Sequence, residues 1–115
     1  MIHYQKNMPQ SMEHEPAGGK GDMTFRTLFA PEDLAGKTGM FAAVTLPAGN
    51  TIGEHLHDSD CEVYYILSGE GVMIEDGKRY PVQAGDVEFC PQGHSHGLDN
   101  LSAEPVTFLA MQLKY

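Results

Sequence analysis

The sequence predicts an all-β domain, closed or sandwich-like, and three observations support this class. Short apolar stretches follow one another along the chain, with turn residues about every eight to twelve positions. The chain contains 13 Gly and 7 Pro and has few stretches with helical periodicity. Asp76-Gly77 lies between two such stretches and predicts a tight hairpin, because a type I′ turn needs positive φ at both central residues. A length of 115 residues favours one domain.

The elements follow in order from a polar beginning. Residues 1–22 are rich in Gly, Pro and Gln, and we expect an N-terminal arm, either poorly ordered or strapped over the barrel. The folded domain is expected over residues 23–115, with one helical turn at 31–36. The expected strands are 23–29, 40–46, 53–57, 62–67, 72–75, 79–82, 87–90 and 105–113.

Charge excludes several classes of partner. The formal net charge is −9, from 16 acidic and 7 basic residues, and no basic stripe is present to neutralise phosphates. We therefore expect neither nucleic acid nor an anionic membrane surface as a partner. The first residues contain no apolar run, no stretch is long enough to span a membrane, and two cysteines do not imply a disulfide framework. We expect a cytoplasmic protein.

Two groups of histidines carry the strongest chemical signal. His55 and His57 are separated by one residue, so on a strand both imidazoles project from the same face. Glu62 opens the next expected strand, and His96 follows the turn at Pro91-Gln92-Gly93. An isolated H-x-H pair is usually a surface pair or a satisfied strand histidine. Two groups together with a glutamate favour a ligand set suited to Mn, Fe, Ni, Co or Zn.

The spacing of these residues resembles the two motifs of the cupin family. The first, G-x5-H-x-H-x4-E-x6-G, is matched at every fixed position by Gly49, His55, His57, Glu62 and Gly69. The second, G-x5-P-x-G-x2-H-x3-N, is matched by Gly85, Pro91, Gly93, His96 and Asn100. The resemblance covers residues 40–113 and implies a double-stranded β-helix, a conical jelly-roll barrel. It also implies one divalent metal ion held by His55, His57, Glu62 and His96. The glycines, Pro91 and Asn100 are interpreted as turn formers.

The resemblance also implies a range of functions. Four protein ligands leave two adjacent positions of an octahedral metal open, and a divalent ion with these ligands carries about +1 charge, which attracts a small anion. The local sequence is similar to cupins described as oxalate-decarboxylase-like, which implies manganese and a small dicarboxylate. Ile52 stands where established two-domain decarboxylases have an Arg three positions before the first histidine. We therefore keep two hypotheses: a metal-dependent decarboxylase, dioxygenase or isomerase acting on an oxalate-like acid, keto acid or diol, and a non-catalytic module that binds such an anion.

Three further residues are candidates for catalysis. Tyr64 alternates in phase with Glu62, so it either lines the cavity or packs in the core. His94 is interpreted first as a solvent-exposed or hydrogen-bonding residue and second as a proton donor. Arg26 either reaches into the barrel toward an anion or faces the surface. Residues interpreted as inert thiols or core are Cys61, Cys90, Met40, Met73, Phe89, Phe108 and Met111.

The resemblance also implies a homodimer. Small single-barrel cupins form dimers in which edge strands or arms pack across the two-fold axis. The alternating stretch Met23–Phe29 is the strand expected to serve this purpose here.

Overall fold

Ten strands make up most of residues 1–114, the part of the chain that the computed structural model describes. Tyr115, the last residue of the expected domain, lies outside the described residues. The strands are β1 (Gln10–His14), β2 (Asp22–Thr27), β3 (Thr38–Leu46), β4 (Thr51–Leu56), β5 (Asp60–Ser68), β6 (Glu70–Glu75), β7 (Lys78–Gln83), β8 (Val87–Cys90), β9 (Ser95–Asp99) and β10 (Val106–Lys114). Three short 3₁₀ helices join them: η1 (Gln5–Asn7), η2 (Pro16–Gly18) and η3 (Pro31–Leu34).

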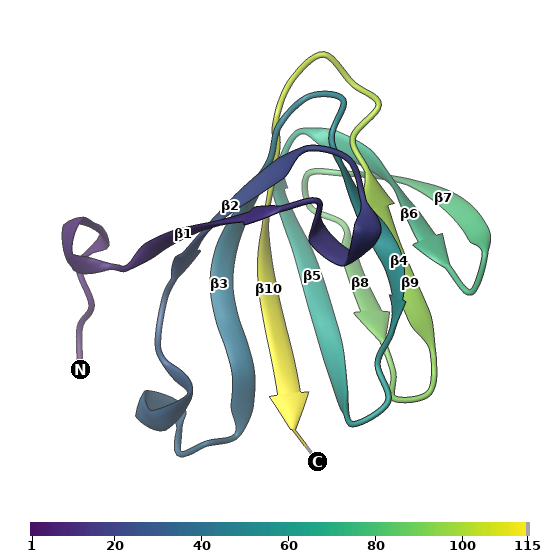
Figure 1. The fold of residues 1–115 in the computed structure, drawn as a ribbon. Coiled ribbons are helices and arrows are strands. Elements are labelled where there is room, and N and C mark those ends of the chain that lie inside the picture. The colour runs from purple at the N-terminus through teal and green to yellow at the C-terminus, as the bar shows by residue number, and fades with distance from the viewer. Residues whose placement is uncertain (115) are drawn as a thin grey trace.

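The strands form two antiparallel sheets that face each other, as the double-stranded β-helix requires (Figure 1). The six-stranded sheet has the order β1-β2-β3-β10-β5-β8, and the four-stranded sheet has the order β4-β9-β6-β7. Neighbours far apart in the sequence, such as β3 and β10, lie side by side (Figure 1). The all-β prediction is confirmed.

Inward and outward residues alternate along each strand, and the inward apolar residues form the core between the sheets. On β3, Ala42, Val44 and Leu46 are buried, and the residues between them face outward. Phe108 and Ala110 lie opposite Val44 and Ala42 on β10 and are buried with them. The remaining buried apolar residues of this cluster are Met23, Ile52, Tyr64, Ile66, Met73, Leu98 and Val106. This apolar half of the interior supports the polar cluster described below.

Two turn predictions are confirmed. Asp76 and Gly77 have φ of 48° and 80°, as the expected hairpin between β6 and β7 requires. Asn100 is fully buried and organises the turn after β9: its amide donates to the carbonyls of Leu46 and Glu104, and its Oδ1 accepts from Ser102.

The N-terminal segment packs against the barrel. Residues 10–14 form β1, which pairs with β2, although all five are exposed and carry no apolar pattern. Backbone pairing rather than apolar burial therefore holds this strand. After it, η2 contacts β4, and the chain passes so close that a Cβ on Gly53 would lie 2.1 Å from the Ala17 carbonyl oxygen. The structure therefore favours the strap over the loose arm.

The position of β2 corrects one expectation. β2 pairs with β1 on one side and β3 on the other, so the stretch Met23–Phe29 offers no free edge for a second copy. The edges of the six-stranded sheet are β1 and β8.

β9 is a strand that the sequence did not predict. Its residues Ser95-His96-Gly97-Leu98-Asp99 lack the β-branched and aromatic residues that mark strands. Gly97 permits the close pairing, since a Cβ there would lie 2.8 Å from the Ile52 carbonyl oxygen of β4.

Two of the expected core residues lie elsewhere. Phe89 is 51% exposed, and Met111 pairs with Val63 and Phe41 on the outward side of the six-stranded sheet. Met40, Met73 and Phe108 are in the core or packed against it. The apolar pattern did not distinguish the two faces, because β5 and β10 are apolar on both.

Candidate metal centre

Four side chains from three segments meet in the barrel interior. His55 on β4 lies opposite His96 on β9, and Glu62 points inward from β5. His57 follows the end of β4, where its backbone N–H donates to the His94 carbonyl and its carbonyl accepts from the Gly93 N–H. These bonds tie the turn at residues 91–93 to the first histidine pair. The structure thus brings together all four expected ligand residues.

The donor atoms of this cluster converge on one point. The Nε2 atoms of His57 and His96 are 3.0 Å apart, and Glu62 Oε1 lies 3.2 Å from the first and 3.0 Å from the second. His55 Nε2 lies 3.9 Å from the same oxygen. All four donor atoms lie within 4.8 Å of one another. Metal–nitrogen distances of about 2.0–2.1 Å place neighbouring donors roughly 3 to 3.5 Å apart, so the cluster fits an ion.

A second set of hydrogen bonds fixes the orientation of each ring. His55 Nδ1 donates to the Gly53 carbonyl at 2.8 Å, and His57 Nδ1 donates to Asp60 Oδ1 at 2.7 Å. His96 Nδ1 lies 3.0 and 3.1 Å from the two oxygens of Glu88. Carbonyls and carboxylates only accept, so each Nδ1 carries a proton, and in its neutral form each ring directs an Nε2 lone pair at the cluster. Three such lone pairs and one carboxylate oxygen need a cation between them, either a proton or a metal ion.

Burial and charge reinforce this preference for a cation. The side chains of His96, Glu62 and His57 are 0%, 2% and 6% exposed, whereas His55 is 28% exposed and marks the open side. Burial alone would lower the pKa of His96, but hydrogen bonds with Glu62 and Glu88 raise it to about 9. Burial alone would raise the pKa of Glu62, but interactions with His55 and His96 lower it to about 2. The hydrogen-bonding interaction with Glu62 also raises the pKa of His55.

Glu88 and Asp60 are site residues that the sequence reasoning missed. Glu88 is 8% exposed and sits on β8, in phase with Cys90 on the inward side. A charged residue at an inward position of the apolar strand Val87–Cys90 was the available signal. Asp60 begins β5, two residues before Glu62, and its spacing from His57 did not indicate that the two side chains are hydrogen-bonded.

The three candidate catalytic residues lie in different parts of the structure. Tyr64 is 4% exposed and lies against His96 with ring centroids 4.7 Å apart, and also against Phe108 at 4.5 Å, so it lines the cluster and packs in the core. His94 is exposed, and its Nδ1 hydrogen-bonds Asp76 at 2.6 Å. Arg26 pairs with Ala43 on the outer side of the sheet and donates to Gln10. The structure therefore brings only Tyr64 to the cluster.

Both cysteines are buried free thiols, as expected for inert residues. Burial, followed by the charge of Glu88, raises the pKa of Cys90 to about 12, so this thiol stays protonated at neutral pH.

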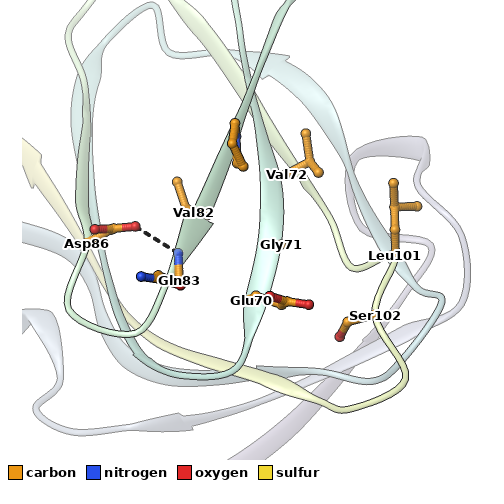
Figure 2. Close-up of a pocket in the computed structure, with 9 residues that line it drawn as sticks. Glu70, Gly71, Val72, Val82, Gln83, Asp86, Leu101 and Ser102 are labelled. Carbon is orange, nitrogen blue, oxygen red and sulfur yellow. Dashed lines mark hydrogen bonds between the residues drawn. The ribbon is translucent and has the colours of Figure 1, made fainter.

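A hollow of about 490 Å³ lies away from this cluster and is bordered by Glu70, Val72, Val82, Asp86 and Leu101 (Figure 2). Glu70 begins β6, whereas Glu75 at the other end of that strand lies opposite His96. The chemistry of the buried cluster, rather than the size of this hollow, marks the functional site.

A two-sheet β-barrel with three histidines and one glutamate gathered inside it defines the class: a double-stranded β-helix with a candidate metal centre. The chain belongs to the cupin family, since residues 42–112 match the family model described as "Cupin domain".

Comparisons with individual proteins agree with this. The chain is 42% identical over 94 residues to the oxalate-binding protein of Thermotoga maritima, covering 82% of this chain and 78% of the relative. It is 33% identical over 106 residues to the oxalate decarboxylase of Bacillus subtilis, covering 85% of this chain but 26% of that longer protein. The crystal structure of a predicted oxalate decarboxylase from Thermotoga maritima superimposes over all of both chains, with a TM-score of 0.95 and 35% identity.

Proposed function

We propose that this protein binds one divalent metal ion through His55, His57, Glu62 and His96 and uses it to bind a small carboxylate of the oxalate type. The observation that carries the proposal is the orientation of the three imidazoles. Their Nδ1 atoms are occupied by Gly53, Asp60 and Glu88, so the Nε2 atoms converge on Glu62 Oε1.

The donor set limits the metal. Three imidazoles and one carboxylate suit Mn, Fe, Co, Ni or Zn, and we propose Mn as the resident ion. A bound ion would act as a Lewis acid that polarises the oxygens of a chelating ligand. The protein would hold it in a dry pocket, because three of the four ligand side chains are almost fully buried.

The anion preference follows from local charge. Two positive charges on the ion, reduced by the carboxylate of Glu62, leave about +1 at the centre of a protein whose net charge is −9. A chelating dicarboxylate neutralises this charge and fills two adjacent positions. The printed names of the relatives from Thermotoga maritima and Bacillus subtilis both refer to oxalate and support this ligand class.

Turnover of the bound acid, by a decarboxylase, dioxygenase or isomerase reaction, is the second candidate. Tyr64 favours it, since it lies beside His96 in the interior. Burial, followed by the charges of Glu62 and Glu88, raises the pKa of Tyr64 well above its ordinary value. Its hydroxyl therefore stays protonated and serves as a hydrogen-bond donor rather than as a base. His94 and Arg26 lie outside the cluster, which makes binding the better-supported function.

The experiment is a metal analysis followed by a titration. Protein purified without a His tag is assayed for metal, then loaded with Mn²⁺ and titrated with oxalate and with acetate by calorimetry. We expect one equivalent of metal, metal-dependent oxalate binding, and much weaker acetate binding, because acetate lacks the second carboxylate. Oxalate binding of equal strength to the metal-free protein would contradict the proposal. Release of CO₂ or formate from the loaded protein would promote the second candidate.

Within residues 1–114, no helix is long and apolar enough to cross a membrane. The cytoplasmic location, and the absence of nucleic-acid and membrane partners inferred from charge, stay predictions.

A further inference from the structure

Arg26 lies outside the metal centre, and its guanidinium has few partners within the protein. It lies on the outward side of β2, next to Phe25, which packs against the core. Among residues 1–114, its one side-chain partner is Gln10 Oε1, at 3.4 Å. The other arginine, Arg79, is bonded to Asp99 at 2.9 Å. A guanidinium has five N–H donors in a planar fork that fits the oxygens of carboxylates and phosphates, so Arg26 has donors left for an anion.

Two adjoining hollows border on Arg26. One measures about 330 Å³ and lies over the outward side of β2, β3 and β10, and the other measures about 430 Å³ and lies nearer the N-terminal segment. They share Gln5, Met8, Gln10 and Arg26, so they form one groove between η1 and the sheet, which we call the Arg26 groove. Lys6 borders its outer part and adds a second positive charge. Hollows of this size are large enough for a small molecule.

Charge distinguishes the Arg26 groove from other hollows of the surface. The chain has 16 acidic and 7 basic residues. Three other hollows each border on two carboxylates. In contrast, no carboxylate of residues 1–114 borders the Arg26 groove, which has the charges of Arg26 and Lys6. A small anion that is repelled by most of the surface is therefore attracted to this groove.

The floor of the groove adds neutral hydrogen-bonding groups. Strand register places Thr24, Thr45 and Thr107 in one row across β2, β3 and β10, and all three border the groove. The hydroxyls of Thr45 and Thr107 lie 3.5 Å apart. A hydroxyl both donates and accepts, so this row can bind the oxygens of an anion or the hydroxyl groups of an organic part attached to it.

We infer that the Arg26 groove binds a small molecule through a phosphate group. A phosphate ester carries about −1.5 to −2 charges at pH 7, which matches the two positive charges of Arg26 and Lys6. A monocarboxylate would neutralise only one of them. The three terminal oxygens of the ester also accept more hydrogen bonds than the two oxygens of a carboxylate, and Arg binds such oxygens in pairs. This site is separate from the metal centre, because Arg26 faces outward whereas the ligand residue Glu62 is buried in the interior.

The test is a calorimetric titration of the protein with inorganic phosphate and with glycerol 3-phosphate, with glycerol as the neutral control. We expect a dissociation constant on the order of 1 mM or lower for glycerol 3-phosphate and no binding of glycerol. Tighter binding of the ester than of inorganic phosphate would assign the threonine row to its organic part, and equal binding would assign the site to the free anion. Treatment with a metal chelator should change neither result, because the site holds no metal ligand. Binding that disappears with the metal would overturn the inference.

Matched variants assign the binding to the groove. Arg26→Gln should raise the dissociation constant by about tenfold or more, because it removes charge-assisted hydrogen bonds. Arg26→Lys should recover only part of the affinity, since Lys lacks the planar fork. Arg79→Gln makes the same charge change at an arginine that already pairs with Asp99, and it should stay within about twofold of wild type.

Lys6 and salt complete the design. Lys6 is exposed, so Lys6→Gln should weaken binding by about twofold to fivefold even if Arg26→Gln fails to fold, and far-UV circular dichroism separates these outcomes. Raising NaCl from about 50 to about 500 mM should also weaken binding, because the screening length falls below the roughly 10 Å of 0.1 M salt. No binding at about 10 mM phosphate, well above the expected constant, or equal binding by the Arg26 and Arg79 variants, would overturn the inference.

Discussion

The two sheets share one interior but present different surfaces to solvent. The four-stranded sheet carries polar pairs outside, such as Arg79 with Asp99 at 2.9 Å and Ser95 with Glu54 at 3.0 Å. The six-stranded sheet carries exposed apolar side chains outside, such as Val87, Phe89 and Tyr65. Inside, both supply the cluster: His55 and His96 come from the smaller sheet, and Glu62 comes from the larger.

This difference teaches that inner and outer residues of one strand serve separate functions. On β5, Glu62 and Tyr64 face the cluster, while Val63 and Tyr65 face outward. Of two adjacent substitutions on this strand, the inward one should therefore affect metal binding and the outward one should not. The predictions below test that separation, from the largest expected effect to the smallest.

Loss of an inner histidine should have the largest effect. His57→Ala and His96→Ala each remove a proposed ligand, and we expect metal content near zero in both, with the barrel retained. Metal analysis and far-UV circular dichroism check the two parts. His94→Ala is the control, because this exposed histidine lies two residues from His96 and bonds Asp76 instead. Full metal content in both inner variants would disprove the ligand assignment.

Substitutions of two neighbouring residues on β5 distinguish the contribution of core packing to stability from that of the outward side of the sheet. Ile66 is 2% exposed, so Ile66→Ala should lower the free energy of unfolding by about 2–5 kcal/mol. Leu67 is 45% exposed, so Leu67→Ala should lower it by less than about 1 kcal/mol. Urea unfolding measures both. Equal losses would mean that the two faces are not distinct.

A substitution of Glu88 tests how much a side chain that contacts the back of the ligand His96 contributes to metal binding. Glu88→Gln keeps the shape but replaces one acceptor of the His96 Nδ1 proton with an amide, and metal affinity should fall by about 10–100-fold. Glu70→Gln makes the same charge change at the far hollow and should leave affinity unchanged. Competition with a metal chelator measures the affinities, and equal behaviour of the two variants would remove Glu88 from the site.

The pH dependence of metal binding, counted per pH unit, should be the smallest of these effects. The pKa of His96 is raised from 6.5 to about 9, so below that pH the metal-free protein holds a proton that the ion must displace. Metal affinity should therefore rise with pH, by up to about tenfold per unit between roughly pH 6 and 8 when one proton is released. Calorimetry in buffers of different ionisation enthalpy counts the protons. An affinity that is constant over this range would contradict the raised pKa.

Much of this arrangement was predictable from the sequence. Residues i and i+2 of a strand project from the same side, so His55 and His57 had to share a face. Asp76-Gly77 favours positive φ at both positions, so it had to form a tight hairpin. The ten positions that match the cupin motifs then implied, by resemblance to that family, the barrel and the grouping of Glu62 and His96 with the two histidines. The shared face and the hairpin are local features, whereas the grouping of distant residues came from the resemblance.

The tertiary structure alone decided the rest. Glu88 and Asp60 orient the ligand rings through contacts that depend on which strands pair, and pairing partners are not encoded in local spacing. Phe89 and Met111 were interpreted as core residues but face outward, because an apolar residue in a strand does not by itself show which side of the sheet faces the interior. β1 lacks any apolar pattern and exists because β2 provides a backbone edge for it. The sequence by itself therefore determined the fold class and the identity of the cluster, whereas long-range strand pairing determined the orientation of its rings and which apolar residues face outward.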